Sequence, residues 1–282
     1  AFKGTSNTTY SEQLTIRIPS GQEKSIKLSV ICMTPNGPAT ESNSNDINSI
    51  IFIIDDETEQ KKVEKKIYEE KEKITEMLNK VLPINVIDEL QKGSESVSFT
   101  VQSATIGCIT IKSPILTNSN DLNAPYKLLS GVFDIFDEML KDFPQLTKVR
   151  TYAYTYEYAG GVFGSVNKPD KHAEEATRFA LKVMSSKSQI ESVVGHDISF
   201  VIGLNTGGPL VAGVISIGKP SFHLIGPAVT YAKKMEDTAE DMQVQITRSV
   251  YELIYAYNFH VTDRGEINIG GGKTMHTYYV SS

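Results

Sequence analysis

Residues 202–215, IGLNTGGPLVAGVI, carry the clearest structural signal in this chain of 282 residues. Two short aliphatic runs flank Asn-Thr-Gly-Gly-Pro at positions 205–209, which is a dense cluster of turn-forming residues. We therefore predict a β-hairpin with strands at residues 198–204 and 210–217. Because the same turn breaks the apolar run at residues 200–218, we do not interpret this run as a membrane-spanning helix.

Helices and strands alternate after this stretch. Gly226-Pro227 comes directly before residues 228–238, where the sequence predicts a helix because proline fits the first helical turn. The remaining predicted elements are strands near residues 243–246, 260–261 and 277–280 and a helix at residues 248–257. The C-terminal part is therefore a mixture of both element types.

The same alternation runs backwards from the predicted hairpin. We expect a strand at residues 97–111, a helix at 121–143, a β-rich segment at 149–163 with a Gly160-Gly161 break, and a helix at 171–194. This β-α-β-β-α-β order predicts an α+β domain with a ferredoxin-like sheet and helices on one face. Four tyrosines at alternate positions of the β-rich segment are read as sheet packing on one strand face: Tyr152, Tyr154, Tyr156 and Tyr158.

Residues 57–82 form a helix rich in Lys and Glu, which Pro83 ends. The apolar residues thin to one seam with a seven-residue repeat, in which Ile67, Ile74 and Val81 occupy the a positions and Val63, Glu70 and Met77 the d positions. This spacing predicts a parallel two-stranded coiled coil with dimerisation through Ile67, Ile74, Met77 and Val81. A lone solvated helix is the alternative, because the repeat covers only about three heptads and includes the charged Glu70.

Three strands with a polar loop are expected between Tyr10 and Ile54. They lead into Asp55-Asp56-Glu57 and the charged helix, and this arrangement resembles the end of a PAS sensor domain, although any antiparallel meander has the same pattern. We therefore divide the chain into residues 1–56 as the C-terminal part of a PAS-like domain, 57–83 as a signalling helix and 84–282 as a further domain.

Composition excludes several classes of protein. The 28 Lys and Arg against 34 Asp and Glu give a net charge of −6, which does not favour binding to nucleic acid. The two cysteines, Cys32 and Cys108, are too few for a disulfide scaffold and fit a reducing compartment. The sequence starts with Ala-Phe-Lys, without the charged and apolar blocks of a signal peptide, and we expect it to be a fragment of a longer protein.

Common catalytic and metal-binding motifs are missing. The five histidines show no paired spacing for zinc, and no GxSxG motif is present. Gly270-Gly-Gly-Lys-Thr274 looks like the end of a phosphate-binding loop, but Ile267 replaces the first glycine of that motif. We interpret these residues as a glycine-rich loop before the last strand.

The residues around the opening stretch resemble the central signature of class III adenylate and guanylate cyclases. That signature runs from the glycine-rich segment at residues 202–215 through Lys219-Pro220 to Gly226-Pro-Ala-Val-Thr-Tyr-Ala-Lys-Lys-Met235. The family's entry and closing strands are matched at Leu82-Pro83, Arg264-Gly265 and Thr277-Tyr278, so the resemblance covers about residues 82–280. It implies the ferredoxin-like fold expected above, a dimeric site and a preceding sensor domain with a signalling helix.

The resemblance also implies which groups would carry the family's chemistry. Two aspartates hold two metal ions, an Asn and an Arg bind the ribose and the reacting phosphate, and a Lys holds the terminal phosphates. The matching positions in this chain are Thr110 and Tyr154 for the metals, Thr230 and Lys234 for the Asn and Arg, and Gly270 for the Lys. Because all five functional groups differ from the family pattern, the resemblance implies a degenerate site.

The positions that read the purine base fall on Arg150 and His223. By the same resemblance, adenylate cyclases have Lys and Asp at these two positions, and guanylate cyclases have Glu and Cys. Arg150 and His223 are both rich in hydrogen-bond donors and fit neither pair. A register shift of three would place Glu157 at the second metal position, but it displaces the match at Gly160-Gly161. Glu157 is otherwise an ordinary strand residue.

We therefore expect a cyclase-homology domain of a cyclic-nucleotide signalling protein that is catalytically inactive and acts as a dimerising or regulatory module in intracellular signal transduction. One alternative is half of a heterodimeric cyclase that forms cAMP or cGMP from ATP or GTP. A second alternative is a dimeric scaffold that senses another small molecule.

The expected partners follow from the same resemblance. They are a second copy or another cyclase-type subunit and a nucleoside triphosphate, without nucleic acid. No cofactor is expected, and Mg²⁺ or Mn²⁺ is needed only if the family activity is retained. The fragment is expected to be soluble and to belong to the cytoplasmic face, with a membrane anchor placed upstream if the full-length protein has one.

Overall fold

The computed structural model describes residues 9–35, 37–38, 48–79, 82–92, 97–118, 121–164, 166–215 and 220–281. The chain divides into two compact units, Ala1–Met77 and Leu78–Ser282, which are described separately. No helix in the described ranges is both long and apolar enough to span a membrane.

The first unit contains a small antiparallel sheet. Its strands are β1 (Thr9–Arg17), β2 (Glu23–Thr34), the two-residue β3 (Gly37–Pro38) and β4 (Ser49–Asp56). β2 is central, because β1 pairs with one of its edges and β4 with the other. The three predicted strands between Tyr10 and Ile54 are confirmed.

Helix α1 (Thr58–Asn79) confirms the predicted charged helix. Asp56 caps its start by accepting a hydrogen bond from the backbone N–H of Thr58 at 3.1 Å. The apolar seam is solvent-exposed in the single chain, at 59% for Ile67, 58% for Ile74 and 66% for Met77. Val81 lies outside the described residues, and the coiled coil stays a prediction.

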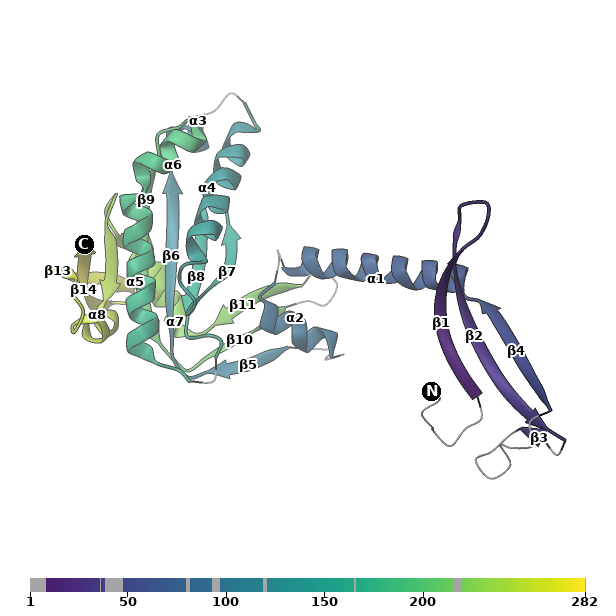
Figure 1. The fold of residues 1–282 in the computed structure, drawn as a ribbon. Helices are drawn as coiled ribbons and strands as arrows, with labels where there is room; N and C mark the ends of the chain where they lie inside the picture. The colour runs from purple at the N-terminus through teal and green to yellow at the C-terminus, as the bar shows by residue number, and fades with distance from the viewer. Residues whose placement is uncertain are drawn as a thin grey trace. The chain divides into compact units, whose positions relative to one another are not determined.

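The second unit is built on a seven-stranded sheet in the order β13-β14-β12-β9-β6-β8-β7. Its first half consists of β6 (Ala104–Lys112), α4 (Ala124–Leu140), β7 (Leu146–Tyr152), β8 (Thr155–Gly160), α5 (Pro169–Ser185) and β9 (Ser199–Gly207). These elements follow the β-α-β-β-α-β order, and their four strands pair antiparallel as β9-β6-β8-β7. The ferredoxin-like arrangement is therefore confirmed (Figure 1).

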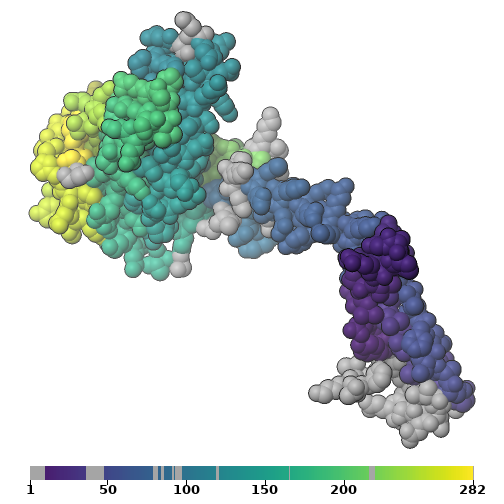
Figure 2. Space-filling view, turned by 45° about the horizontal axis from the view of Figure 1, so that its top comes forward, coloured from purple at the N-terminus to yellow at the C-terminus, as the bar shows by residue number. Residues whose placement is uncertain are grey.

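The C-terminal residues extend this sheet. The elements are α7 (Pro227–Thr238), β12 (Val244–Thr247), α8 (Arg248–Ile254), β13 (His260–Gly270) and β14 (Lys273–Ser281). β12 pairs parallel to β9, and the β13–β14 hairpin continues outward from it. Helix α8 packs against α5, and the yellow C-terminal part of the chain lies beside the green part in Figure 2. The hydroxyl of Tyr257, just after α8, donates to Asp170 on α5 at 3.0 Å.

The sheet of the second unit separates two apolar layers. On one face α4 and α5 pack over the larger core, where Phe136, Phe179 and Phe200 are fully buried. α4 and α5 are the helices that the ferredoxin-like arrangement predicts on one face of the sheet. On the opposite face α7 packs against β6 and β9, next to a second core that includes Cys108 and Ala232. The candidate site lies on this second face.

Two predicted strand arrangements were wrong. The expected single strand at residues 97–111 is two strands, β5 (Ser98–Val101) and β6, in different sheets. The predicted hairpin does not form, because β10 (Leu210–Ile215) pairs with β5 and β11 (Ser221–Ile225) instead of β9. A strand has only two hydrogen-bonding edges, and β6 and β12 already occupy both edges of β9.

The four tyrosines do not lie on one strand. Tyr152 ends β7, Tyr154 lies in the turn, and Tyr156 and Tyr158 belong to β8. The last two are fully buried under α4 and α5, so they do pack in the core, whereas Tyr154 is 42% exposed. Across the two-residue turn Tyr152 pairs with Thr155, so Tyr156 and Tyr158 face the side of the sheet opposite to Tyr152.

The remaining helices complete the second unit. They are α2 (Ile84–Gln91), α3 (Pro114–Asn118) and α6 (Lys187–Val194). α6 follows α5 directly and together they form the helical stretch expected at residues 171–194. Gly195, with φ of 73°, caps α6 in the left-handed conformation that glycine adopts without a steric cost.

A buried histidine makes the stability of this unit depend on pH. His172 is fully buried on α5, within 2.8 Å of Thr105 Oγ1 and 3.3 Å of Asn167 Oδ1. Burial lowers its pKa from 6.5 to about 4. The unfolded chain therefore binds a proton that the folded chain does not, and stability present above pH 6.5 is lost as the pH falls toward 4.

We expect this loss to reach about 3 kcal/mol, and urea unfolding between pH 7 and pH 4 measures it. Because carboxylates also titrate in this range, the pH dependence is compared with that of His172→Gln, which lacks the buried imidazole. His260→Gln, at an exposed histidine, is the matched control. An unchanged pH dependence in His172→Gln would contradict the assignment.

Candidate functional site

The two positions expected to hold metal ions are neighbours. Thr110 lies near the end of β6, and Tyr154 lies in the β7–β8 turn beside it. The backbone N–H of Ile111 donates to the carbonyl of Tyr154 at 3.0 Å, and the hydroxyls of Thr110 and Thr155 are 2.5 Å apart. Thr110 and Tyr154 line one cavity of about 610 Å³.

The oxygen ligands that this cavity offers do not fit a hard divalent cation. Mg²⁺ and Mn²⁺ prefer carboxylate oxygens, whereas Thr110 and Tyr154 offer neutral hydroxyls. Asp197 and Asp241 also line the cavity, but Lys187 lies 3.3 Å from the first and Lys112 lies 2.5 Å from the second. Across the described ranges no group of three or more His, Cys, Asp and Glu side chains is placed to hold a metal ion.

The two predicted base-reading residues are brought into direct contact. Arg150 on β7 and His223 on β11 are 73 residues apart, yet Nη1 of Arg150 lies 3.0 Å from Nδ1 of His223. Glu157 on β8 accepts a hydrogen bond from Nε of Arg150 at 2.8 Å. Ser221 Oγ lies 2.7 Å from His223 Nε2. One hydrogen-bonded chain therefore links three strands.

Hydrogen-bond chemistry fixes the tautomer of His223. A guanidinium can only donate, so Nδ1 of His223 accepts from Arg150 and the ring proton is on Nε2. That proton is donated to Ser221 Oγ, which leaves the serine O–H free to donate elsewhere. Burial and the positive charge of Arg150 lower the pKa of His223, which keeps the ring neutral at pH 7.

Glu157 has a role that the sequence did not reveal. Its side chain is only 1% exposed, and Oε1 has no hydrogen-bond partner in the part of the chain that the structure describes. It lies opposite Cys108 on β6, whereas Thr155 lies opposite Thr110, so Glu157 is not at the metal position that a shifted register would give it. The opposite charges of Arg150 and Glu157 could have indicated their ion pair, but only once the β7–β8 register was known.

Helix α7 presents two further predicted residues. Thr230 is exposed, and Lys234 is partly exposed one turn later. The backbone carbonyl of Lys234 accepts from Thr238 Oγ1 at 2.8 Å, whereas its ammonium has no hydrogen bond or ion pair to another described residue. The neighbouring Lys233 points to the sheet, where it pairs with the buried Glu236 and lies 5.8 Å from the ring of Tyr152. Lys234 is thus the cation of this helix that is available to a ligand.

Gly270 lies apart from these residues within one chain. It is the last residue of β13, directly before the β13–β14 turn, at a φ of 97°, and its N–H donates to Asn268 Oδ1 at 2.8 Å. β13 is one edge of the seven-stranded sheet and β7, which carries Arg150, is the other. The structure therefore does not bring Gly270 together with Arg150 and His223 in a single chain.

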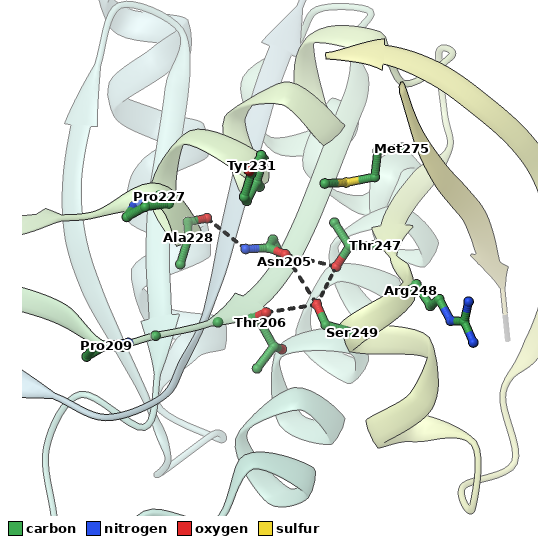
Figure 3. Close-up of a pocket in the computed structure, with 12 residues that line it drawn as sticks. Asn205, Thr206, Pro209, Pro227, Ala228, Tyr231, Thr247, Arg248, Ser249 and Met275 are labelled. Carbon is green, nitrogen blue, oxygen red and sulfur yellow. Dashed lines mark hydrogen bonds between the residues drawn. The ribbon is translucent and has the colours of Figure 1, made fainter. Parts of the chain in front are cut away.

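A second cavity, of about 470 Å³, lies at the opposite end of β9 (Figure 3). Asn205 is central there, because its amide donates to the carbonyl of Ala228 at 2.9 Å and accepts from Thr247 Oγ1 at 2.9 Å. Ser249 Oγ donates to the carbonyl of Thr206 at 2.8 Å. These bonds join the start of α7 to β9 and β12, so the polar groups serve the fold.

Comparison with known proteins identifies the fold. The chain is 28% identical over 218 residues to the human guanylate cyclase soluble subunit beta-2, covering 75% of this chain and 34% of the relative. The guanylate cyclase domain of RhGC from Catenaria anguillulae, solved in complex with GTP, is 26% identical with a TM-score of 0.59, covering 65% of this chain and 98% of that one.

A dimeric guanylyl cyclase domain of the RhoGC fusion protein from Blastocladiella emersonii is also 26% identical, with a TM-score of 0.56 and coverage of 64% of this chain and 97% of that one. This chain spans about a third of the length of the soluble-subunit relative. Residues 104–282, well over half of the sequence, match the adenylate and guanylate cyclase catalytic domain. The chain belongs to that family.

Proposed function

We propose that this protein is a cyclase-homology module without metal-dependent catalysis, which dimerises and regulates a cyclic-nucleotide signalling protein. The observation that supports the proposal is the pairing of the end of β6 with the β7–β8 turn, which brings together the neutral side chains of Thr110 and Tyr154. These are the positions that the resemblance assigns to the family's carboxylates. Without those carboxylates no group holds the cations that neutralise a triphosphate. We propose a nucleoside triphosphate as the ligand of this module.

We further propose that residues 57–83 pair two copies, or this chain and another cyclase-type subunit, through a coiled coil. The exposed seam of α1 supports this, because Ile67, Ile74 and Met77 would otherwise face water. The solved relative described as dimeric is consistent with it. Residues 1–56 are proposed to be the end of a PAS-like sensor, since the antiparallel sheet leads through Asp56 directly into α1.

A second candidate function is one half of a composite cyclase. Two observations favour it: the Lys234 ammonium has no partner among the described side chains, and Arg150 contacts His223. A subunit that lacks metal ligands still contributes if it holds the base or a phosphate. The human relative is named as a subunit. This candidate requires turnover when a subunit with intact carboxylates is added.

Purified protein is expected to form no cyclic nucleotide from ATP or GTP with Mn²⁺, because the cations have no carboxylate ligands at residues 110 and 154. Chromatographic detection of cAMP and cGMP measures this, with an active guanylyl cyclase domain as the positive control. Sustained turnover by the isolated protein would contradict the proposal.

The complementary control restores the carboxylates. Thr110→Asp combined with Tyr154→Asp is expected to raise the melting temperature when Mn²⁺ is added, since two neighbouring carboxylates repel unless a cation neutralises them. Each single variant provides only one carboxylate and is the matched control. A folded double variant that does not respond to the metal would show that these two positions are not the family's metal positions.

A further inference from the structure

The cavity at the end of β9 has an apolar part that fits a flat ring. Tyr231 of α7, Met275 of β14, Pro209 and Pro227 supply the apolar side chains of its lining. In Figure 3, Tyr231 and Met275 lie on the same side of the hydrogen-bond network around Asn205. An aromatic ring and a thioether both pack favourably against another aromatic ring. This part of the cavity therefore suits an aromatic group.

The polar side chains of the same cavity have little hydrogen-bonding capacity left for a ligand. Asn205 donates to a backbone carbonyl and accepts from Thr247 Oγ1, and Ser249 Oγ donates to the carbonyl of Thr206. The hydroxyl of Thr206 lies 2.6 Å from that of Thr105. Because these groups satisfy and orient one another, a ligand must find its polar contact elsewhere in the lining.

Arg248, at the start of α8, is the charged residue among the described side chains that line the cavity. Its side chain is 72% exposed, and its Nε donates to Glu252 one turn later at 2.8 Å. The two Nη groups have no hydrogen bond or ion pair to another described residue. An exposed ion pair within one helix is weak, so the guanidinium can still bind a second anion.

The free edge of this guanidinium selects the chemistry of the ligand. Its Nη groups present two parallel N–H donors and no acceptor. A carboxylate matches them with two oxygens in a bidentate pair, and the opposite charges make these hydrogen bonds stronger than those to a neutral group. The fitting ligand therefore combines a carboxylate with an aromatic ring.

We propose that this cavity binds a small aromatic carboxylate, with the ring against Tyr231 and Met275 and the carboxylate on the Nη groups of Arg248. The volume of about 470 Å³ is in the range of pockets that hold small organic ligands. The cavity shares no lining residue with the one at the predicted metal positions. The inference goes beyond the proposed function and does not depend on a nucleotide.

The test titrates 2-naphthoate into the full chain labelled with ¹³C in its methionine methyl groups and follows these resonances by NMR. The chain has seven methionines, and Met275→Leu identifies the resonance of Met275 by its loss. A ring seated against Met275 shifts this resonance through its ring current, and we expect the shift to saturate. Met77, which is 66% exposed on α1, reports non-specific binding and should not shift.

Two analogues separate the contribution of the ring from that of the charge. 2-Naphthamide keeps the ring and the shape but is neutral, so we expect it to bind about tenfold more weakly, the loss expected for a hydrogen bond to a charged group. Acetate keeps the carboxylate without the ring. It should leave the Met275 resonance unchanged at concentrations at which 2-naphthoate saturates the shift.

Variants locate the two contacts. Arg248→Met removes the guanidinium and keeps an apolar side chain, so 2-naphthoate and 2-naphthamide should then bind equally. Arg178→Met is the matched control, because Arg178 is an exposed arginine that forms the same i,i+4 type of ion pair with Glu174, and it should keep the tenfold difference. Tyr231→Ala should weaken both ligands to the same extent. Melting curves without ligand establish that each variant is folded.

Three results would overturn the inference: a Met275 resonance that does not respond to millimolar 2-naphthoate, equal affinities of 2-naphthoate and 2-naphthamide for the unmodified protein, or a preference for the carboxylate that survives in Arg248→Met. Shifts of Met77 and Met275 that rise together without saturation would also overturn it, because they would report non-specific binding. Each of these measurements is independent of the test for cyclic product.

Discussion

Replacing Gly203 by alanine will destabilise the second unit by about 3 kcal/mol or more. A Cβ atom at this position would lie 2.1 Å from the backbone nitrogen of Glu236 and 2.7 Å from the carbonyl oxygen of Ala232, both on α7. Because these are backbone atoms, the helix itself must move away from β9. The melting temperature should fall by about 10 °C, and circular dichroism measures it.

Gly131→Ala is the matched control for this prediction. Gly131 lies within α4, and its added Cβ would meet only the end of the Val194 side chain, at 3.3 Å. Alanine also favours a helix by about 1 kcal/mol over glycine, so the control should be neutral or slightly stabilising. Equal melting temperatures for Gly203→Ala and the unmodified protein would contradict the close approach of α7 to β9.

The double change Ile67→Asp plus Ile74→Asp will convert a dimer to a monomer. In a parallel coiled coil both positions face the partner helix, and burying an unpaired carboxylate costs several kcal/mol at each site. In the single chain the same residues are more than half exposed, so the folded monomer tolerates the charge. Analytical ultracentrifugation at micromolar concentration measures the change in mass.

Tyr68→Asp is the matched control, because Tyr68 is 63% exposed on the same helix but lies outside the seam. This variant should remain dimeric. A monomeric unmodified protein under the same conditions would rule out the coiled coil and favour the solvated helix. A double variant that stays dimeric would place the dimer contact elsewhere in the chain.

Local sequence patterns were sufficient for the element types and their order. Apolar periodicity reports which face of a helix or strand is buried, and it placed α1, α4 and α7 within a few residues of their observed bounds. The single helix predicted at residues 171–194 is the two helices α5 and α6. The β-α-β-β-α-β order then restricted the second unit to the ferredoxin-like arrangement. The resemblance to the cyclases also put Thr110 and Tyr154 on adjacent segments, where they are found.

Residue identity was likewise enough to select two residues, predicted to read the base, that the structure brings into contact. Arg150 and His223 came from a resemblance between short motifs, and their contact at 3.0 Å joins β7 to β11. No local pattern could show that Glu157 completes this cluster, since its neighbours in the sequence are ordinary strand residues. A cross-strand partner is set by the register of two strands, which depends on the turn between them.

Local patterns could not predict which strands pair, for a related reason. Periodicity describes the faces of a strand but not its two edges, and the edges of β9 were taken by β6 and β12 rather than by β10. Likewise, residue 203 must be glycine because the backbone of α7 packs against it. That helix lies about 30 residues later in the chain. The chain itself specifies element type, order and chemistry, whereas neighbours remote in sequence select edges, register and close approaches, because hydrogen bonding and steric exclusion act through space.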